Sequence, residues 1–426
     1  MNASVTVPQR TKFNAKIVWL IALAVFAQEI SWNFYDSQIP VSLAKYITSV
    51  GVVGFVMGLD NLLGIFIQPL IGNLSDNTRT RWGRRMPFIM FGIPLAALIF
   101  TLFPFEKSLT QLMILIVLYV TVMLAFKSPV DSLMPDFIPP QHRSKGNSIL
   151  KIVTSLTVIL GAVISMLFVD KNLQLAFFIP AALMFIIWPI LMANVKEKDA
   201  PGYQKALAEE QQGQKEAQPA EKVKLLPTFW SLFKNRDKSH LLMLVTILLA
   251  AAAWSALRAL LTRYGMEQLA MSRGSAGGLT LPGGIAFLLL AYPVALLSEK
   301  FGRKLFMLIG LGLMAFGLLL GFLIQTATLL RVTVILVSVG WSAVSINGLV
   351  LVWNMSANFK TTGTFTGLFY FFYYLGQAFG PGVVGSITDL TGWYPFLLVT
   401  AGVALLALLA LVFVKTGGER MRTDWE

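Results

Sequence analysis

The sequence contains no cysteine and only two histidines, His142 and His240. The lack of cysteine excludes a disulfide framework, thiol catalysis and a thiolate-bound metal, and two histidines are too few for an imidazole metal site. No nucleophile with a neighbouring base stands out either. We therefore expect neither an enzyme nor a bound cofactor.

Charged residues are scarce as well. They make up 13% of the 426 residues, whereas hydrophobic residues make up 56% and mean hydropathy is +0.70. A soluble globule could not bury so much apolar surface, so a lipid bilayer is the expected environment. The net charge is +13, but the basic residues are scattered through short loops. This distribution indicates membrane topology and argues against a nucleic-acid partner.

Twelve apolar segments have about the 20 residues needed to cross a bilayer. They predict an all-α membrane protein with twelve transmembrane helices in two pseudo-symmetric six-helix halves. The first six are Ile17–Ile39, Val50–Leu74, Pro87–Phe105, Leu112–Pro135, Ser148–Val169 and Leu173–Val195. The second six are His240–Leu261, Ala276–Leu297, Leu305–Ile324, Val332–Trp353, Gly363–Ile387 and Tyr394–Val414.

A polar stretch rich in Gln, Glu, Lys and Ala separates the two sets. It divides the chain into an amino-terminal bundle (1–195), a linker (196–238) and a carboxy-terminal bundle (239–426). Most Lys and Arg residues fall on the side of the linker and both termini, so the positive-inside rule places that side in the cytoplasm. The first segment is too long for a signal-peptide core and has no cleavage pattern, so we expect it to remain in a multi-pass inner-membrane protein.

A loop motif follows both the second and the eighth segment. The first copy contains Gly72, Asp76, Arg81, Gly83, Arg84 and Arg85, and the second contains Glu299, Gly302 and Arg303. This pattern resembles the cytoplasmic loop signature of the major facilitator superfamily, in which glycine permits close backbone approach and the acid pairs with nearby basic residues and helix ends. The resemblance implies two repeated halves around a midplane site, with these residues acting as a cytoplasmic gating motif.

Longer strings narrow this resemblance. Over Gln68–Ile89, Ser128–Asn147 and Gly363–Pro381, the chain is similar to the sucrose-type disaccharide transporters and, more distantly, to the glycoside-pentoside-hexuronide cation symporters. The sucrose-type carriers usually have a basic residue where this chain has Asp131, and here the cation comes four residues earlier, as Lys127. The resemblance implies a sugar substrate, although this departure weakens the inheritance of a particular one.

Sodium coupling is not supported by the same resemblance. In melibiose-type symporters, carboxylates of the second and fourth helices hold sodium, and the matching positions here are Gly64, Gln68 and Lys127. A sodium site needs several converging oxygen ligands, whereas a proton needs one carboxyl. Proton coupling is therefore the expectation.

Ionisable residues inside the apolar segments are the main site candidates, because a charge in hydrocarbon is costly. Glu29, Asn33 and Asp36 are spaced i, i+4 and i+7, on one helix face that we expect to line a cavity. Asp60 lies in the middle of its segment beside Asn61, with no basic residue within one turn. Burial favours the neutral form of a carboxyl, so we predict Asp60 as the proton-coupling site and Glu29 as the runner-up. A carboxyl held only as a structural tie is the alternative.

Three basic residues also lie within apolar segments. Lys127 and Asp131 are four residues apart and are expected to pair, either as a structural pair or as a gate. Lys151 is expected to reach the cytoplasmic surface along its own helix. For Arg258 the same explanation competes with an outer gate or a substrate contact.

Polar and aromatic residues share faces in the second half. Tyr370, Tyr373, Tyr374 and Gln377 are spaced i, i+3, i+4 and i+7, which suits a sugar, because hydroxyls need polar partners and C–H faces lie on aromatic rings. Tyrosines that only tie helices together are the alternative. The full predicted substrate-binding set is Asn33, Asp36, Asn61, Gln68, Lys127, Asp131, Arg258, Asn347, Asn354, Tyr370, Tyr373, Tyr374 and Gln377.

We expect a monomeric secondary transporter that moves a sugar, with a disaccharide favoured, together with a proton by alternating access. A proton-linked drug or metabolite exporter is one alternative, but such exporters usually carry a Gly-Pro motif in the fifth helix, and Thr154–Met166 has no proline. A non-transporting sensor or assembly relative is the other. Such a relative could dispense with midplane charges, whereas this chain keeps Glu29, Asp60, Lys127 and Asp131.

Overall fold

The structure is a computed structural model that describes residues 14–139, 142–211, 237–355 and 359–415. Nearly all of these residues are helical, and the described part of the chain contains one isolated β-bridge, between Thr80 and Gly83. Most of the predicted linker lies outside the described residues.

The helices of the first half follow the predicted segments closely. They are α1 (Ala15–Ala44), α2 (Val50–Asn77), α3 (Met86–Leu102) with the 3-10 turn η1 (Phe103–Phe105), α4 (Leu109–Phe137), α5 (Arg143–Ile164) continued by the π-helical turn η3 (Ser165–Val169), and α6 (Leu173–Asn194). The start of the predicted linker forms the 3-10 turn η4 (Glu197–Asp199) and α7 (Pro201–Gln211).

The second half repeats this order with one added short helix. Its helices are α9 (Ser239–Glu267), α10 (Arg273–Gly277), α11 (Thr280–Phe301), α12 (Arg303–Leu323), α13 (Ala327–Met355), α14 (Phe359–Thr391) and α15 (Phe396–Val412). Among the described residues, ten helices are long and apolar enough to cross a membrane. With α14, of 33 residues, and the apolar α15, of 17, they account for the twelve predicted segments.

Several helices begin earlier than the apolar pattern predicts, because polar side chains cap their amino-terminal turns. The Ser108 hydroxyl accepts a hydrogen bond from the Gln111 amide, so α4 begins at Leu109 rather than Leu112. The Asn14 side chain caps α1 in the same way, so α1 begins at Ala15 rather than Ile17. Such caps satisfy backbone N–H groups that have no partner within the helix.

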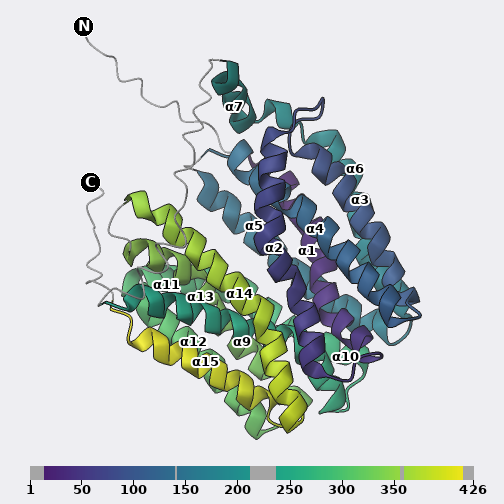
Figure 1. Ribbon diagram of the computed structural model, residues 1–426, viewed down its shortest axis with the longest axis vertical. Coiled ribbons are helices and arrows are strands. Elements are labelled where there is room, and N and C mark those ends of the chain that lie inside the picture. The colour runs from purple at the N-terminus through teal and green to yellow at the C-terminus, as the bar shows by residue number, and fades with distance from the viewer. Residues whose placement is uncertain (1–13, 140–141, 212–236, 356–358, 416–426) are drawn as a thin grey trace.

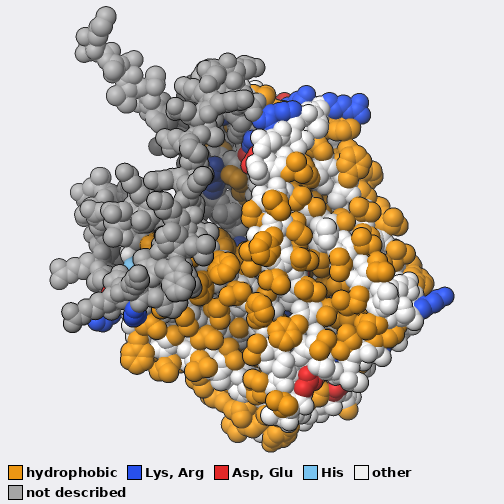
Figure 2. Space-filling view, viewed as in Figure 1, with side chains coloured by type: hydrophobic (Ala, Val, Ile, Leu, Met, Phe, Trp, Pro, Cys, Tyr) orange, Lys and Arg blue, Asp and Glu red, His pale blue; other side chains and the backbone are white. Residues whose placement is uncertain are grey.

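The helices form two groups that come together near α10 and separate toward α7 (Figure 1). We call the end at which α6 ends and α9 begins the linker end. The opposite end, where α1 ends at Ala44 and α14 ends at Thr391, is the far end. Hydrophobic side chains cover the flank seen in Figure 2, and Lys and Arg gather at the linker end. This is the surface expected of a protein that lies across a bilayer.

Candidate substrate cavity and gating networks

A cavity between the two groups of helices divides into two adjoining chambers. The first has a volume of about 210 Å³ and is lined mainly by polar and charged groups. These come from both halves: Glu29, Trp32, Asp36, Met57, Asp60, Asn61, Gln68, Leu124, Lys127, Ser255, Arg258, Ala259, Tyr373, Tyr374 and Gln377. Most of the predicted substrate-binding set therefore lies around one space.

The second chamber has a volume of about 220 Å³ and a more apolar wall. It shares Glu29, Arg258, Tyr373 and Gln377 with the first chamber. Its other lining residues include Asn33, Lys151, Thr154, Trp254, Phe287 and Trp341. A solute can therefore contact a polar wall and an aromatic wall at the same time.

Arg258 of α9 joins the second half to α1 across the cavity. Its Nη2 lies 2.6 Å from Oδ2 of Asp36 and donates to Oδ1 of Asn33 at 3.1 Å. The Asn33 amide in turn donates to the Thr157 hydroxyl of α5 at 3.0 Å. Because its guanidinium is held inside the cavity, Arg258 does not extend along its helix to the surface, which was one of the two explanations expected for it.

Lys127 lies between two carboxylates rather than one. Its Nζ is 3.8 Å from Oδ2 of Asp131, as the spacing predicts, and 3.9 Å from Oε1 of Glu29. The Asp131 side chain is 55% exposed, whereas that of Glu29 is 25% exposed. Attraction between charges weakens as water reaches them, so Glu29 is the better-shielded partner.

Asp60 differs from the other cavity carboxyls. Its Oδ1 accepts hydrogen bonds at 2.7 Å from both the backbone amide and the side-chain amide of Asn61. Among the described residues, no cationic nitrogen lies within 4.0 Å of its carboxylate. The residue is buried and lines the first chamber. Asp60 thus has polar contacts but no fixed counter-charge.

Aromatic rings form a stacked row beside the second chamber. The rings of Trp254 and Trp341 are parallel within 7° with centroids 5.2 Å apart. Trp341 also stacks on Tyr373 at 6.2 Å, and Tyr373 on Phe369 at 6.3 Å. Offset stacking of this kind fixes the ring planes, so the wall presents flat faces in a defined orientation.

Three members of the predicted tyrosine face line the first chamber, namely Tyr373, Tyr374 and Gln377. Tyr370 is 43% exposed and lines neither chamber.

The asparagines predicted on α13 do not reach the cavity in this conformation. Asn347 is fully buried, and its side chain contacts the Ala343 carbonyl and Arg303 instead. Asn354, seven residues or about two helical turns further along α13, is exposed. Their seven-residue spacing predicts that they share one helix face. It does not predict where that face lies, and in the structure both residues lie beyond the cavity, toward the linker end.

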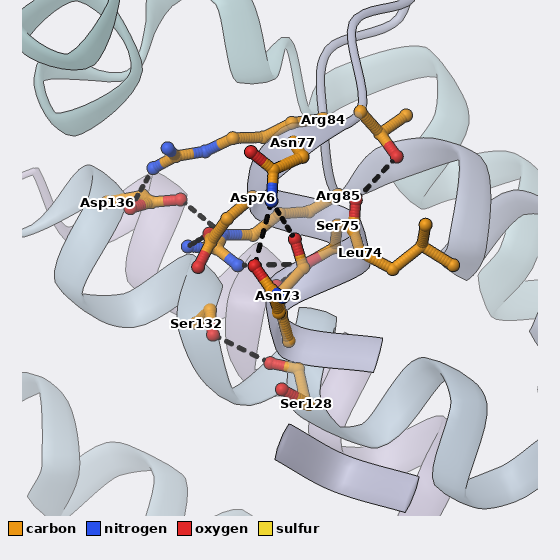
Figure 3. Close-up of polar contacts among 12 residues, drawn as sticks. Asn73, Leu74, Ser75, Asp76, Asn77, Arg84, Arg85, Ser128, Ser132 and Asp136 are labelled. Atoms are coloured by element: carbon orange, nitrogen blue, oxygen red, sulfur yellow. Dashed lines mark hydrogen bonds and ion pairs between the residues drawn. The ribbon is translucent and has the colours of Figure 1, made fainter. Parts of the chain in front are cut away.

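The first copy of the loop motif builds a compact ionic network at the linker end (Figure 3). Asp136 of α4 accepts from Arg84 at 2.8 Å and from Arg85 at 2.5 Å. Arg85 also lies 3.0 Å from Asp76 at the end of α2. Glu197 accepts from the backbone amides of Arg85 and Met86, at 2.8 and 2.9 Å. All of these partners lie in the first half or directly after it.

The motif glycines allow this packing. Gly83 has a φ of +116°, and a Cβ built on it would lie 2.4 Å from a Glu197 carboxylate oxygen. Gly72 faces Ser128 of α4 more loosely, with its built Cβ 3.1 Å from the hydroxyl. Arg81 lies over the Trp82 ring, 4.2 Å from its centroid.

The second copy is sparser. Glu299 and Arg303 are 3.4 Å apart, and the Glu299 side chain is 63% exposed. Gly302 has a φ of +106°, which a residue with a Cβ adopts only under strain, so it separates α11 from α12. Lys304 donates to the carbonyls of Val412 and Val414 at the end of α15.

At the far end, polar contacts cross from one half to the other. Arg273 donates to Oε1 and the carbonyl of Gln38, at 2.8 and 2.9 Å, and Arg263 donates to the Thr48 carbonyl at 3.0 Å. Glycines of α2 pack on the α14 backbone, and a Cβ on Gly58 would lie 1.8 Å from the Ala378 carbonyl oxygen. The cavity is therefore closed at the far end. On the other side, exposed Lys151 and Ser345 line its wall.

Some site residues escaped the sequence reasoning. Trp254 and Trp341 are indistinguishable from other apolar positions in the sequence, but they line the second chamber. Lys151, expected at the cytoplasmic surface, also lines this chamber. Asp136 lies within the family-like stretch Ser128–Asn147, but its ion pairs were not predicted. Glu197 was assigned to the linker, yet it is fully buried. A signal existed only for Asp136, because it directly follows the predicted segment Leu112–Pro135, where a charge without a partner is costly.

Comparison with known proteins matches nearly the whole chain to one family. The model of the Major Facilitator Superfamily matches residues 21–290 and 266–424. The lactose permease of Lactobacillus helveticus is 35% identical over 80 residues, which cover 18% of this chain and 12% of that protein. The sucrose transport protein SUC4 of Arabidopsis thaliana is 28% identical over 89 residues, which cover 20% of this chain and 17% of that protein. The matched stretches thus span less than a fifth of these relatives.

Solved structures extend the likeness to the whole fold. The nucleoside transporter NupG superposes with a TM-score of 0.74 at 14% identity, covering 94% of this chain and 100% of that one. A peptide transporter, POT, gives 0.72 at 15% identity, covering 95% and 96%. At such low identity these matches concern the fold alone.

Proposed function

Because this chain belongs to the major facilitator superfamily of secondary transporters, we propose that it moves a sugar, with a disaccharide favoured, together with a proton. The two halves would alternate in exposing the cavity, and the linker end would face the cytoplasm. The partial matches to a lactose permease and a sucrose transport protein support a sugar over other solutes.

The two-chamber cavity is the observation that carries the substrate proposal. A sugar ring needs amide, carboxylate and hydroxyl partners around its edge and an aromatic ring against its C–H face. The first chamber offers the polar groups, including Asn61, Gln68 and Gln377, and the second offers the indole wall of Trp254 and Trp341. Arg258 and Tyr373 lie between them. Two linked rings would occupy both chambers, whereas a single ring would leave one empty.

Charge balance in the first chamber supports the proton. Among the residues that line the first chamber, the carboxylates of Glu29 and Asp36 have the cations of Lys127 and Arg258 as neighbours. Asp131, the other neighbour of Lys127, is not part of this lining and is 55% exposed. Asp60 is the third carboxyl of the chamber and has no fixed counter-charge. Burial disfavours a charged carboxyl, so a proton on Asp60 would leave the chamber electrically neutral. Release of that proton would add a negative charge to the chamber that contains Arg258. Protonation of Asp60 would thereby be coupled to the Arg258–Asp36 ion pair that joins the two halves.

Binding to the purified protein tests the substrate class. The temperature of thermal unfolding should be raised by one or more of sucrose, maltose, lactose, melibiose and trehalose, because binding stabilises the folded state. Glucose or galactose should raise it less. Trp254→Ala should weaken binding of the disaccharide at least about fivefold, since a desolvated aromatic contact contributes about 1 kcal/mol or more.

Trp19→Ala is the matched control, because Trp19 is 50% exposed and lines neither chamber. Stabilisation by apolar cations with no response to any sugar would instead favour the exporter alternative. Equal losses of disaccharide binding in Trp254→Ala and Trp19→Ala would show that the indole wall does not contact the substrate.

A further inference from the structure

Two copies of the sequence Ser-x-Gly-x-x-Gly lie at the far end. One is Ser49–Gly54, which opens α2, and the other is Ser272–Gly277, which leads into α11. The helices α2 and α11 are each the second long helix of their half. The two copies therefore occupy equivalent places in the two halves.

Asp389 of the second half binds the copy in the first half. Its carboxylate accepts from the Ser49 hydroxyl at 2.5 Å, the Val50 amide at 2.6 Å and the Gly51 amide at 2.9 Å. Asp389 lies two residues before the end of α14, the fifth long helix of its half.

Asp170 of the first half binds the copy in the second half in the same manner. Its carboxylate accepts from the Ser272 hydroxyl at 2.5 Å and the Gly274 amide at 2.7 Å. Asp170 directly follows η3, which continues α5, the fifth long helix of the first half. Each aspartate thus carries hydrogen bonds from one half to the serine and first glycine of the other.

The glycines make room for these contacts. A Cβ on Gly51 would lie 2.3 Å from the Ser386 hydroxyl, and one on Gly274 would lie 2.6 Å from Asp170 itself. The second glycines, Gly54 and Gly277, face Pro381 and Ser165 across the same boundary, with built Cβ distances of 2.2 and 2.1 Å. The repeat therefore combines hydrogen-bond donors with close approach of the two halves.

We propose that Asp170 and Asp389 are two equivalent latches that hold the far end closed, and that both release when the cavity opens to that side. Both aspartates are exposed, so water can take over their hydrogen bonds when the halves part, and no buried charge is stranded. Charge-assisted bonds favour the closed state while they last. The proposal does not depend on which solute is carried.

The natural lack of cysteine makes the test direct, because one introduced thiol is the only one in the chain. Thr262 is 3% exposed, and its hydroxyl meets Ser37 of the other half at 3.4 Å, so a Thr262→Cys reporter should react slowly with a maleimide. A Ser345→Cys reporter, exposed on the cavity wall, should react quickly. Labelling of the purified full chain in detergent needs no assumption about membrane orientation.

Asp170→Ala and Asp389→Ala should each accelerate labelling of the Thr262→Cys reporter by about fivefold, the effect expected for losing such hydrogen bonds. They should slow labelling of the Ser345→Cys reporter, and the double variant should give roughly the product of the single effects. The Asn variants, which keep an acceptor oxygen, should lie between wild type and Ala. Opposite changes at the two reporters indicate a shift between conformations.

Lys45→Gln is the matched control, because Lys45 pairs with Glu106 at 2.7 Å at the same end but within one half. It should leave both rates unchanged. The proposal is overturned if the rates do not respond, if only one aspartate matters, or if both reporters react faster, since the last result means local unfolding.

Discussion

The two ends of the molecule differ in where their polar contacts run. At the linker end, Arg84 and Arg85 are tied to Asp136 within the first half. At the far end, Arg273 reaches Gln38 and Arg263 reaches the Thr48 carbonyl, each in the other half. Contacts within a half can persist while the halves move, whereas contacts between halves must break and re-form. The linker-end networks should therefore determine stability, and the far-end contacts should determine which conformation is populated.

Breaking the linker-end network should have the largest effect on stability. Asp136→Ala leaves two buried guanidinium groups without their shared carboxylate, which should lower the free energy of unfolding by about 3 kcal/mol. Glu299→Ala alters the sparser second copy, whose acid is 63% exposed, and should cost at most about 1 kcal/mol. Thermal unfolding of the purified variants would measure the difference. Equal shifts would contradict the contrast between the two copies.

A substitution that obstructs closure of the far end should affect transport more than folding. Gly58→Ala places a methyl group where the Ala378 carbonyl oxygen lies when the far end is closed. An overpacked contact costs about 1–3 kcal/mol, so transport should fall at least about fivefold. Gly402→Ala is the control, because nothing lies within 4 Å of its built Cβ. Full transport by Gly58→Ala would mean that α2 and α14 need not approach this closely.

Removing charge from the cavity should give intermediate effects. Lys127→Met should impair transport, and combining it with Glu29→Gln should restore more activity than combining it with Asp131→Asn, because Glu29 is better shielded from water. Coupling of about threefold for Glu29 is a reasonable expectation for a partly buried pair. Initial transport rates of the single and double variants provide the double-mutant cycle from which this coupling is calculated. Strictly additive losses would show that the three residues act independently.

The smallest effects should separate two tyrosines of one helix. Tyr374→Phe removes a hydroxyl from the first chamber and should weaken substrate binding by about threefold, the value of an ordinary hydrogen bond. Tyr370→Phe should leave binding unchanged, because Tyr370 lines neither chamber. Dissociation constants of the purified variants are the readout. A larger loss in Tyr370→Phe would place the site nearer the linker end.

Local pattern was sufficient to predict the helices and much of the cavity wall. Apolar segment length gave the membrane helices, and the spacing of Glu29, Asn33 and Asp36 gave one cavity face. The same reasoning misplaced Asn347, because periodicity defines a helix face but not what that face meets.

Contacts between distant parts of the chain could not be read from pattern. Arg258 and Asp36 are 222 residues apart, and their pairing depends on how the two halves dock. Lys151 was expected to extend to the surface, since a single helix does not reveal a neighbouring cavity. The Ser-x-Gly-x-x-Gly repeat was present in the sequence, but its meaning depends on Asp170 and Asp389, which come from the opposite halves.

Asp60 is proposed to couple sugar movement to protons. Uptake of a labelled disaccharide into proteoliposomes, driven separately by imposed proton and sodium gradients, tests it most directly in wild type and in Asp60→Asn. We expect a proton gradient alone to drive accumulation in wild type. Asp60→Asn, which mimics the protonated carboxyl, should retain substrate exchange but lose accumulation. Accumulation driven by sodium in wild type, or full proton-driven accumulation by Asp60→Asn, would contradict it.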